Sequence, residues 1–366
     1  MKIEFNKDRL LNTIAKAVRL TTNKNSSLPI LNCFLFEAQN NQLKIQATNL
    51  DIGITLDIPV KTERPGKVAV PAEVFSNLIN NLPNSNQIKI DVEGENLKIK
   101  TERSETIVKV RDSEDFPKIP TTQSESFKIS TAEFVNSLKS VWYSSTHNSL
   151  KPELSSVFIY TEDGYMVFAA TDSFRLSEKR IKIKQSEDFG HALIPFRNAL
   201  EIAKAFENED GELQIYLDTN QISLSSGNIY LTSRLVDGSF PDYKQIIPKK
   251  FKTEITVLRQ DLVNALKVAN VFSDKFNQVN FKVDPSKKTF EVTTKNPEIG
   301  ENVYQVDAVF TGEPIDINFN MKYITDSLSS LGSDSLTLSF NELSKPMVIE
   351  GVGDKSFLYL VMPMNK

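Results

Sequence analysis

Side chains that could act as a nucleophile and a base meet in one short stretch, "ATDSFR", where Thr171, Asp172 and Ser173 are neighbours. A serine needs a base within hydrogen-bond reach to become nucleophilic, and no such base follows Ser173 at motif spacing. The sequence has two histidines, His147 and His191, which we expect in different half-domains. This placement disfavours a Ser-His-Asp triad. We therefore predict no catalytic residues, and a β-rich hydrolase using Asp172 and Ser173 stays as the enzymatic alternative.

The sequence also offers few residues that could form a metal or cofactor site. Cys33 is the single cysteine, and its apolar neighbours in "LNCFLF" favour a buried thiol over a nucleophile. The acidic turn "ENEDGE" (207–212) does not fit a calcium loop, because Phe206 stands where the first carboxylate ligand belongs. The sequence holds no glycine-rich phosphate loop, dinucleotide fingerprint or H-E-x-x-H motif. We predict neither a metal nor a cofactor.

Composition limits the protein class. A chain of 366 residues that is 40% apolar and 25% charged predicts a globular protein of about two to three domains. Its net charge of −4 argues mildly against a nucleic-acid partner, but an average over the surface does not exclude one basic face. Without an apolar run of membrane-spanning length or a signal-peptide pattern in "MKIEFNKDRLL", we expect a cytoplasmic protein with no membrane partner.

The sequence contains three copies of the elements that must position these side chains. The five apolar positions of 3–14 recur with the same spacing at 127–138 and again at 255–266. Each copy opens with an alternating apolar pair, which is typical of a strand, and continues with the i, i+1, i+4 spacing of an amphipathic helix. The repeated unit is therefore predicted to be a strand followed by a helix.

A second strand-helix signal lies in the later half of each copy, at 67–82, 192–206 and 315–331. Pro71 and Pro195 stand where two of these helices should begin, a position that tolerates a missing N–H. The third helix has Asn320 at the same place, which is a good N-cap residue. Alternating runs after these helices predict antiparallel strands with one solvated face.

A repeat of this length matches a whole domain and is too long for a solenoid unit. We predict an α+β protein of three tandem domains of similar fold, each with two helices packed on antiparallel sheets. Prolines, charges and a loss of periodicity place the domains at 1–121, 122–248 and 249–366.

Three stretches carry a closer resemblance. "ATDSFRL" (170–176), "SRLVDGSFPDY" (233–243) and "YLVMPM" (359–364), supported by "LPIL" (28–31), closely resemble motifs of the bacterial DNA polymerase III beta subunit, the replicative sliding clamp. The resemblance covers the whole chain and its three-part division. It implies a ring-shaped, head-to-tail homodimer around duplex DNA, with helices lining the hole and sheets outside. It also implies a non-catalytic processivity factor that holds the polymerase on its template.

In this family one pocket between the second and third domains takes short linear peptides, typically a glutamine followed by a leucine and a terminal Leu-Phe pair. The resemblance implies as partners the replicative polymerase catalytic subunit, the clamp loader, other polymerases and mismatch-repair proteins. Flexible methionine side chains suit a site that accepts several peptides. Carried over position by position, the pocket consists of Leu154, Thr171, Ser173, Arg175, Leu176, Pro241, Ile246, Leu360, Met362, Pro363 and Met364.

The sequence departs from the family pattern at Phe174, Gln245 and Asn365, which leaves the peptide preference open. Leu358 and Val361, in the strand before the tail, are expected to point into the core by alternation.

A ring that encloses DNA needs only weak, sequence-independent contacts with phosphates. Arg9, Lys16 and Arg19 fall on one side of the first helix, opposite its apolar side. Together with residues on comparable helices and one loop, the predicted DNA-facing set is Arg9, Lys16, Arg19, Lys24, Lys139, Arg197, Lys204, Lys267 and Lys322. The resemblance also implies a ring contact between Thr106 and Val108 of one chain and Val271 and Phe272 of the next. A linear peptide-binding scaffold that does not encircle DNA remains the non-enzymatic alternative.

Overall fold

A computed structural model of the chain describes residues 1–21, 28–82, 87–122, 125–146, 150–183 and 189–364. The chain divides into two compact units, each of which we describe by itself. The first unit consists of Met1–Val135 and Leu200–Leu235, and the second of Asn136–Ala199 and Val236–Lys366.

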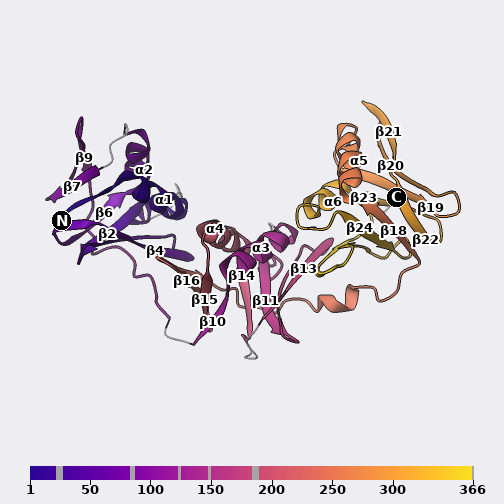
Figure 1. The fold of residues 1–366 in the computed structure, drawn as a ribbon, viewed down its shortest axis with the longest axis horizontal. Helices are drawn as coiled ribbons and strands as arrows, with labels where there is room; N and C mark the ends of the chain where they lie inside the picture. The colour runs from indigo at the N-terminus through magenta and orange to yellow at the C-terminus, as the bar shows by residue number, and fades with distance from the viewer. Residues whose placement is uncertain (22–27, 83–86, 123–124, 147–149, 184–188, 365–366) are drawn as a thin grey trace. The chain divides into compact units, whose positions relative to one another are not determined.

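The repeated strand-helix unit is confirmed at all six predicted places (Figure 1). Local capping explains two of the helix starts. The Asn6 side chain accepts hydrogen bonds from the backbone N–H groups of Asp8 and Arg9, and Asn320 accepts one from Tyr323 at 3.2 Å. The six units are β1 (Lys2–Asn6) with α1 (Lys7–Ala17), β6 (Gly66–Pro71) with α2 (Ala72–Asn81), β10 (Ser126–Ser130) with α3 (Thr131–Val141), β14 (His191–Pro195) with α4 (Phe196–Phe206), β18 (Thr253–Leu258) with α5 (Arg259–Val271), and β23 (Ile315–Asn320) with α6 (Met321–Ser327).

The first unit contains two antiparallel sheets. A five-stranded sheet has the order β5 (Lys61–Arg64), β1, β7 (Gln87–Glu93), β8 (Asn96–Lys100) and β9 (Glu105–Lys109). An eight-stranded sheet has the order β10, β15 (Glu212–Leu217), β16 (Gln221–Ser226), β17 (Ile229–Arg234), β4 (Ile52–Pro59), β3 (Gln42–Thr48), β2 (Cys33–Gln39) and β6. Since β4 pairs with β17, this one sheet joins strands of the first and second repeats.

The second unit also contains two antiparallel sheets. Its nine-stranded sheet has the order β14, β11 (Ser156–Glu162), β12 (Tyr165–Thr171), β13 (Arg175–Lys182), β26 (Asp354–Val361), β25 (Met347–Gly351), β24 (Ser335–Phe340), β18 and β22 (Ala308–Gly312). Its four-stranded sheet has the order β21 (Gly300–Gln305), β20 (Thr289–Asn296), β19 (Gln278–Asp284) and β23. The pairing of β13 with β26 joins the second repeat to the third.

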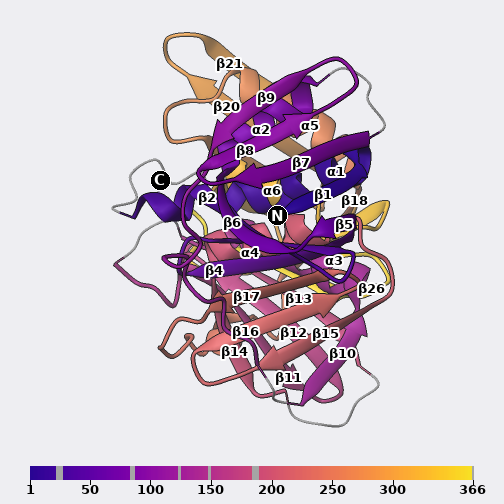
Figure 2. The same cartoon turned by 90° about the vertical axis from the view of Figure 1, so that its left-hand side faces the viewer.

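Paired helices lie against the sheets in each unit. In the first unit α1 packs on α2 and lies close to β1 in Figure 2, and Leu10 and Ile14 are buried in the core as their spacing predicts. In the second unit α5 packs on α6 over a large apolar core. Four short 3-10 helices complete the described chain: Val18–Leu20, Pro29–Asn32, Trp142–Ser144 and Tyr243–Ile246.

Candidate functional site

The "ATDSFR" stretch forms the tight turn between β12 and β13. Thr171 Oγ1 donates a hydrogen bond to the carbonyl of Arg175 at 2.7 Å, and Ser173 adopts a left-handed conformation with φ of 77°. Asp172 Oδ1 accepts from the backbone N–H groups of Phe174 and Arg175, both at 3.0 Å. The aspartate is thus engaged in holding the turn, which favours a structural role over that of a base for Ser173.

Arg175 is the central polar residue of this site. Its side chain is buried, its Nε donates to Asp172 Oδ2 at 2.9 Å, and its Nη1 donates to Asp326 Oδ2 at 2.8 Å. The guanidinium also lies over the Tyr323 ring, 4.4 Å from the centroid. Burial alone would lower the pKa of Arg175, but the neighbouring Tyr359, Asp326 and Asp172 outweigh it and raise the pKa. Arg175 therefore stays charged and fixes the turn to helix α6.

The chain terminus lies beside this turn. Leu176 of β13 pairs with Leu360 of β26, and the backbone N–H of Met362 donates to the carbonyl of Phe174 at 2.7 Å. Further along, the N–H of Met364 donates to the Asn318 carbonyl at 2.8 Å. The "YLVMPM" tail is therefore an ordered edge of the site up to Met364.

Leu176 and Leu360 belong to a small apolar cluster on one face of the nine-stranded sheet, which we call the outer-face cluster. Its buried members are Ala169, Leu176, Tyr243, Val348 and Leu360, and its half-buried members are Phe158, Tyr160, Phe240, Ile247, Phe251, Leu358 and Met362. Residues of the segment 236–252 that follows β17 cover this face of the sheet. Leu176 and Leu360, both buried, form an apolar floor beside half-buried Met362, a composition of the kind that a leucine-containing peptide would need.

The structure brings Thr171, Arg175, Leu176, Leu360 and Met362 together around the turn. The remaining predicted pocket residues differ in setting. Leu154 is buried, Ser173 and Pro241 are exposed, Ile246 is 49% exposed, and Pro363 and Met364 are half-buried.

The expectation for Leu358 is wrong. Val361 is fully buried in the main core of the second unit, whereas Leu358 is half-buried in the outer-face cluster. The two residues are three positions apart, so the period of two in a strand places them on opposite faces.

Sequence reasoning missed several members of this site. Asp326 and Tyr323 come from α6 and meet Arg175 only because β13 pairs with β26. Tyr243, inside the quoted "FPDY", is buried and donates a hydrogen bond to Glu178. Its place in the quoted "SFPDY" step is the sequence signal that could have found it.

Three of the predicted DNA-facing residues of the first unit are paired with acidic residues. Lys16 forms an ion pair with Glu209, Arg19 lies 3.7 Å from Glu201, and Lys204 lies 3.3 Å from the same Glu201. Arg9 is exposed and shares with Lys16 a cavity of about 310 Å³. These cations are half-buried or exposed, so their pairs can exchange with water or phosphate at small cost.

The other predicted DNA-facing residues lie on α3, α4, α5 and α6. Arg197 and Lys267 are exposed, Lys139 is half-buried, and Lys322 pairs with Asp326 at 3.0 Å. Lys24 lies outside the described residues.

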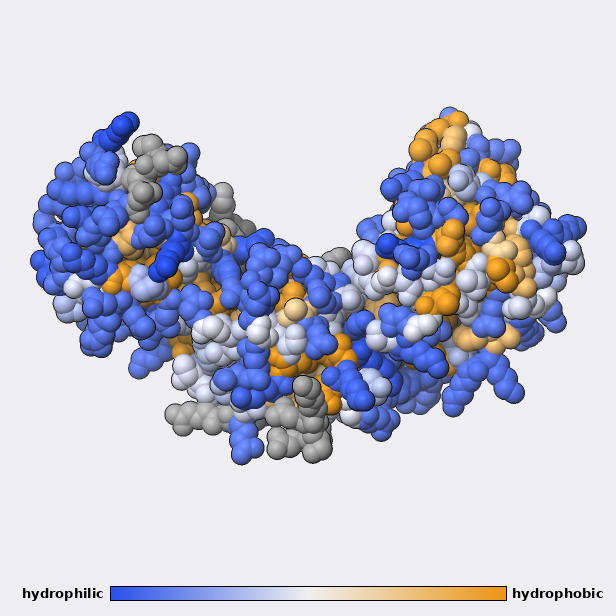
Figure 3. Space-filling model, viewed as in Figure 1, coloured by the Kyte–Doolittle hydropathy of each residue, from blue (hydrophilic) through white to orange (hydrophobic). Residues whose placement is uncertain are grey.

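The residues predicted for the ring contact lie at or near sheet edges. Strand β9 is an edge of the five-stranded sheet, where Thr106 is half-buried, Val108 is buried and the neighbouring Ile107 is 57% exposed. At the end of α5, Val271 is 65% exposed and Phe272 packs near Gly300. Figure 3 shows apolar side chains gathered where α5 ends in the third repeat. The sequence did not single out the adjacent edge strand β21, which exposes Val303.

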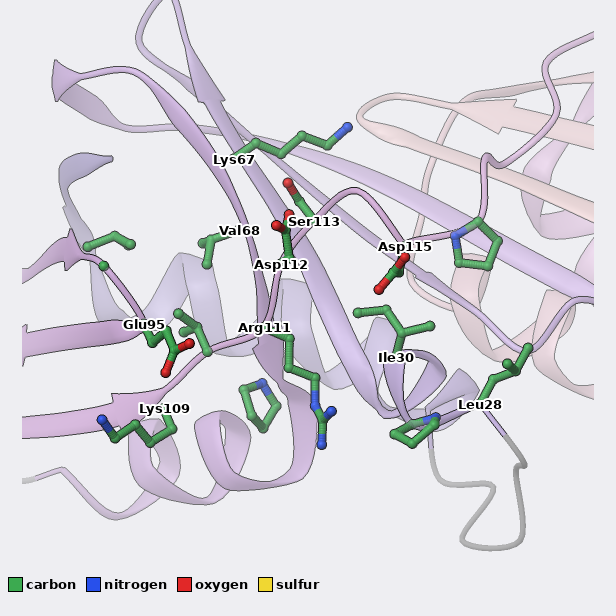
Figure 4. A pocket seen from close by; sticks show the side chains of 16 residues that line it. Leu28, Ile30, Lys67, Val68, Glu95, Lys109, Arg111, Asp112, Ser113 and Asp115 are labelled. Atoms are coloured by element: carbon green, nitrogen blue, oxygen red, sulfur yellow. The ribbon is translucent and has the colours of Figure 1, made fainter.

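A cavity of about 1060 Å³ lies in the first unit, beside the "LPIL" stretch (Figure 4). Lys67, Lys109 and Arg111 line it together with acidic side chains such as Glu95 and Asp112. The three cationic side chains point in different directions in Figure 4, so they do not converge on one anion.

Two further searches concern the described residues only. Nowhere among them do three or more His, Cys, Asp or Glu side chains gather in a way that could hold a metal ion. None of the helices in this part of the chain has the length and apolar character needed to cross a membrane.

Three family models match successive parts of the chain. They describe the N-terminal domain of the DNA polymerase III beta subunit at residues 1–120, its central domain at 128–242 and its C-terminal domain at 244–365. Together they leave only short stretches unmatched.

Whole-chain comparisons agree with these models. The chain is 27% identical to the beta sliding clamp of Vibrio cholerae, with 100% of both chains covered, and 27% identical to that of Escherichia coli, with 93% of each covered. The sliding clamp structure from Bacillus subtilis matches with a TM-score of 0.95 at 25% identity, covering 100% of this chain and 99% of that one. The DNA polymerase III beta subunit structure from Thermotoga maritima matches with a TM-score of 0.93 at 26% identity and the same coverage. The chain belongs to the family of bacterial DNA polymerase III beta subunits, the sliding clamps of DNA replication.

Proposed function

We propose that two copies of this chain join head to tail into a ring around duplex DNA and tether the replicative polymerase by enclosure. The observation that carries the proposal is that two edge strands of the described sheets, β9 and β21, each bear an exposed apolar side chain, Ile107 and Val303. An exposed edge strand offers unpaired N–H and C=O groups to another strand. Pairing of β9 with β21 of a second copy would satisfy both edges, and a head-to-tail contact that closes forms a ring.

Enclosure requires little from the DNA-facing residues. A ring that slides must bind phosphates weakly and without reading sequence, which exchangeable cations such as Lys16 and Arg19 allow. The net charge of −4 is compatible with this function, because only the faces that meet DNA need cations. We assign Arg9, Lys16, Arg19, Lys24, Lys139, Arg197, Lys204, Lys267 and Lys322 to these faces. A role in copying the chromosome would place the protein in the cytoplasm.

The site around Arg175 would bind the linear motifs of partner proteins, which include the polymerase catalytic subunit, the clamp loader, other polymerases and mismatch-repair proteins. Its floor of Leu176 and Leu360 is apolar, and half-buried Met362 can adapt to different side chains. Because the site contains no paired nucleophile and base, we propose a non-catalytic role for the protein.

A trapping experiment tests the enclosure. The protein is loaded by a clamp loader onto a nicked circular plasmid, the nick is sealed, and retention is measured by gel filtration before and after linearisation. We expect retention on the circle and release from the linear DNA, because a ring can slide off free ends. Equal retention on both forms would favour the non-encircling scaffold.

The edge pairing and the hydrolase alternative have separate tests. An Ile107→Asp substitution should convert the dimer to monomers in analytical ultracentrifugation, while Leu343→Asp, at an equally exposed apolar side chain, should leave the dimer intact. For the hydrolase, the purified protein should turn over no generic ester or peptide substrate. Turnover that Ser173→Ala abolishes in a correctly folded variant would count against the non-catalytic role.

A further inference from the structure

A cavity of about 430 Å³ opens in the second unit, on the same sheet face as the Leu176 and Leu360 floor. Phe158 and Tyr160 of β11, His191 of β14, and Phe240, Pro241 and Lys244 of the covering segment line it. Ligand pockets in proteins usually measure about 300–1,000 Å³, so this cavity is at the small end of that range and has room for one large side chain.

The cavity has an aromatic wall. The rings of Phe158 and Tyr160 stack with their centroids 4.8 Å apart, and Phe158 stacks equally closely on Phe240 at an interplanar angle of 14°. His191 pairs with Tyr160 across the two strands, and its ring lies 6.2 Å from that of Phe158. An aromatic side chain of a ligand that entered the cavity would gain stacking or edge-to-face contacts with these rings.

The cavity shares one wall residue, Tyr243, with the outer-face cluster of the proposed peptide site. This side chain lines the cavity and also packs in the outer-face cluster with Leu176 and Leu360. Its hydroxyl bonds with that of Tyr160 at 2.8 Å and donates to the buried carboxylate of Glu178. Burial raises the pKa values of Tyr243 and Tyr160, so both stay neutral at physiological pH. The shared wall is therefore fixed and uncharged.

The charges around the cavity disfavour an anionic ligand. Lys244 is ion-paired with Glu162, and it also lies 5.4 Å from the Tyr160 ring centroid. Arg180 lies 2.7 Å from Glu178 and 3.6 Å from Glu162. A phosphate or carboxylate would have to compete with these carboxylates, whereas a neutral ring would leave the pairs intact.

We propose that this cavity receives an aromatic side chain of a partner peptide whose neighbouring residues enter the site over Leu176 and Leu360. The proposal rests on the peptide-binding role proposed above and adds a specificity position to it.

Fluorescence anisotropy with the full-length protein tests the inference. The core peptide contains a glutamine, a leucine and a terminal Leu-Phe pair, and longer peptides carry Trp or Ala at each of three positions on either side. At one of these positions we expect Trp to bind about tenfold more tightly than Ala, which corresponds to about 1.4 kcal/mol.

Two variants locate the gain. His191→Trp should fill the cavity and abolish the advantage of Trp while the core peptide binds as before, because His191 is not part of the outer-face cluster. Phe240→Ala should also abolish the advantage by removing part of the cavity wall, and because Phe240 belongs to that cluster its effect is measured as the ratio of Trp to Ala peptide affinity. His191→Ala keeps the cavity open and should preserve the advantage. Thermal melting of each variant reports its folding.

The outcomes separate the two proposals. Failure of the core peptide to bind overturns the peptide site and this inference with it. If the core peptide binds but Trp brings no gain at any position, or if the gain survives both His191→Trp and Phe240→Ala, only this inference is overturned.

Discussion

Arg175 and Lys16 are both paired with carboxylates, but they differ in burial and in the number of their partners. Arg175 is buried between Asp172 and Asp326 and lies over an aromatic ring, so its position is fixed by three neighbours. Lys16 is half-buried, and its ion-pair partner in the described part of the chain is Glu209. A buried cation with several partners holds the local geometry in place. A lysine in a half-exposed ion pair can exchange its carboxylate partner for another anion.

This difference corresponds to the two tasks proposed for the protein. Recognising a peptide requires a turn and a floor that keep their geometry, which Arg175 provides by joining the β12–β13 turn to α6. Sliding along DNA requires contacts that form and break without a large barrier, which suits Lys16 and Arg19. The predictions below test whether the two groups of cations really differ.

The largest effect is expected for Arg175→Ala. Its removal leaves Asp172 and Asp326 without their common partner, and losing one member of a buried pair costs about 3–5 kcal/mol of unfolding free energy. Urea denaturation should show a marked fall in the midpoint for the second unit, and peptide binding should be lost. Lys204→Ala, at a half-exposed pair, serves as the control and should change the midpoint little. Similar losses in the two variants would contradict the comparison.

The double variant Lys16→Ala with Arg19→Ala should instead affect DNA binding. Each phosphate contact removed should lower the slope of log affinity against log salt by about 0.9. Anisotropy with a linear duplex at several salt concentrations measures this slope. The stability of the variant should change by less than about 1 kcal/mol for each pair lost. An unchanged slope would remove these two residues from the DNA-facing set.

Glu209→Gln is a milder test of exchange. It frees Lys16 from its partner, so we expect duplex affinity to rise by about two- to fivefold at low salt. Glu93→Gln also removes a carboxylate that pairs with a lysine, Lys98, but on a strand outside the predicted set, and it should leave DNA affinity nearly unchanged. Equal gains in both variants would indicate a general effect of net charge.

An effect of a different kind is expected at alkaline pH. Burial raises the pKa of Tyr143, whose ring lies near Arg175, to about 12. In the unfolded chain a tyrosine loses its proton near pH 10, so the unfolding free energy should fall as pH rises from about 10 to 12, by up to about 1.4 kcal/mol per pH unit. Tyr143→Phe should reduce this slope in denaturation series at pH 9 to 11. An identical slope would place Tyr143 in a more solvated setting.

Much of the fold could be predicted because its signals are local. Each strand-helix unit is encoded within about fifteen residues, so all six appear where their periodicity predicts. Strand pairing carries no such local signal, and the joining of repeats through β4–β17 and β13–β26 could not be derived from spacing.

The same limit applies to the site. Arg175, Leu176 and Met362 came from resemblance to a family, but Asp326 is 151 residues from Arg175 and nothing in the sequence connects them. Leu358 shows a different failure, since the period of two, applied strictly, would have separated it from Val361.

The two sheets that run across repeat boundaries have a practical consequence for anyone who wishes to study the parts alone. A fragment ending near residue 121 would leave β4 without β17, and one ending near 248 would leave β13 without β26. Each truncation exposes a strand edge whose backbone N–H and C=O groups can pair with strands of other molecules. Isolated repeats of this protein should therefore aggregate, whereas in the intact chain the backbone groups of both strands are hydrogen-bonded.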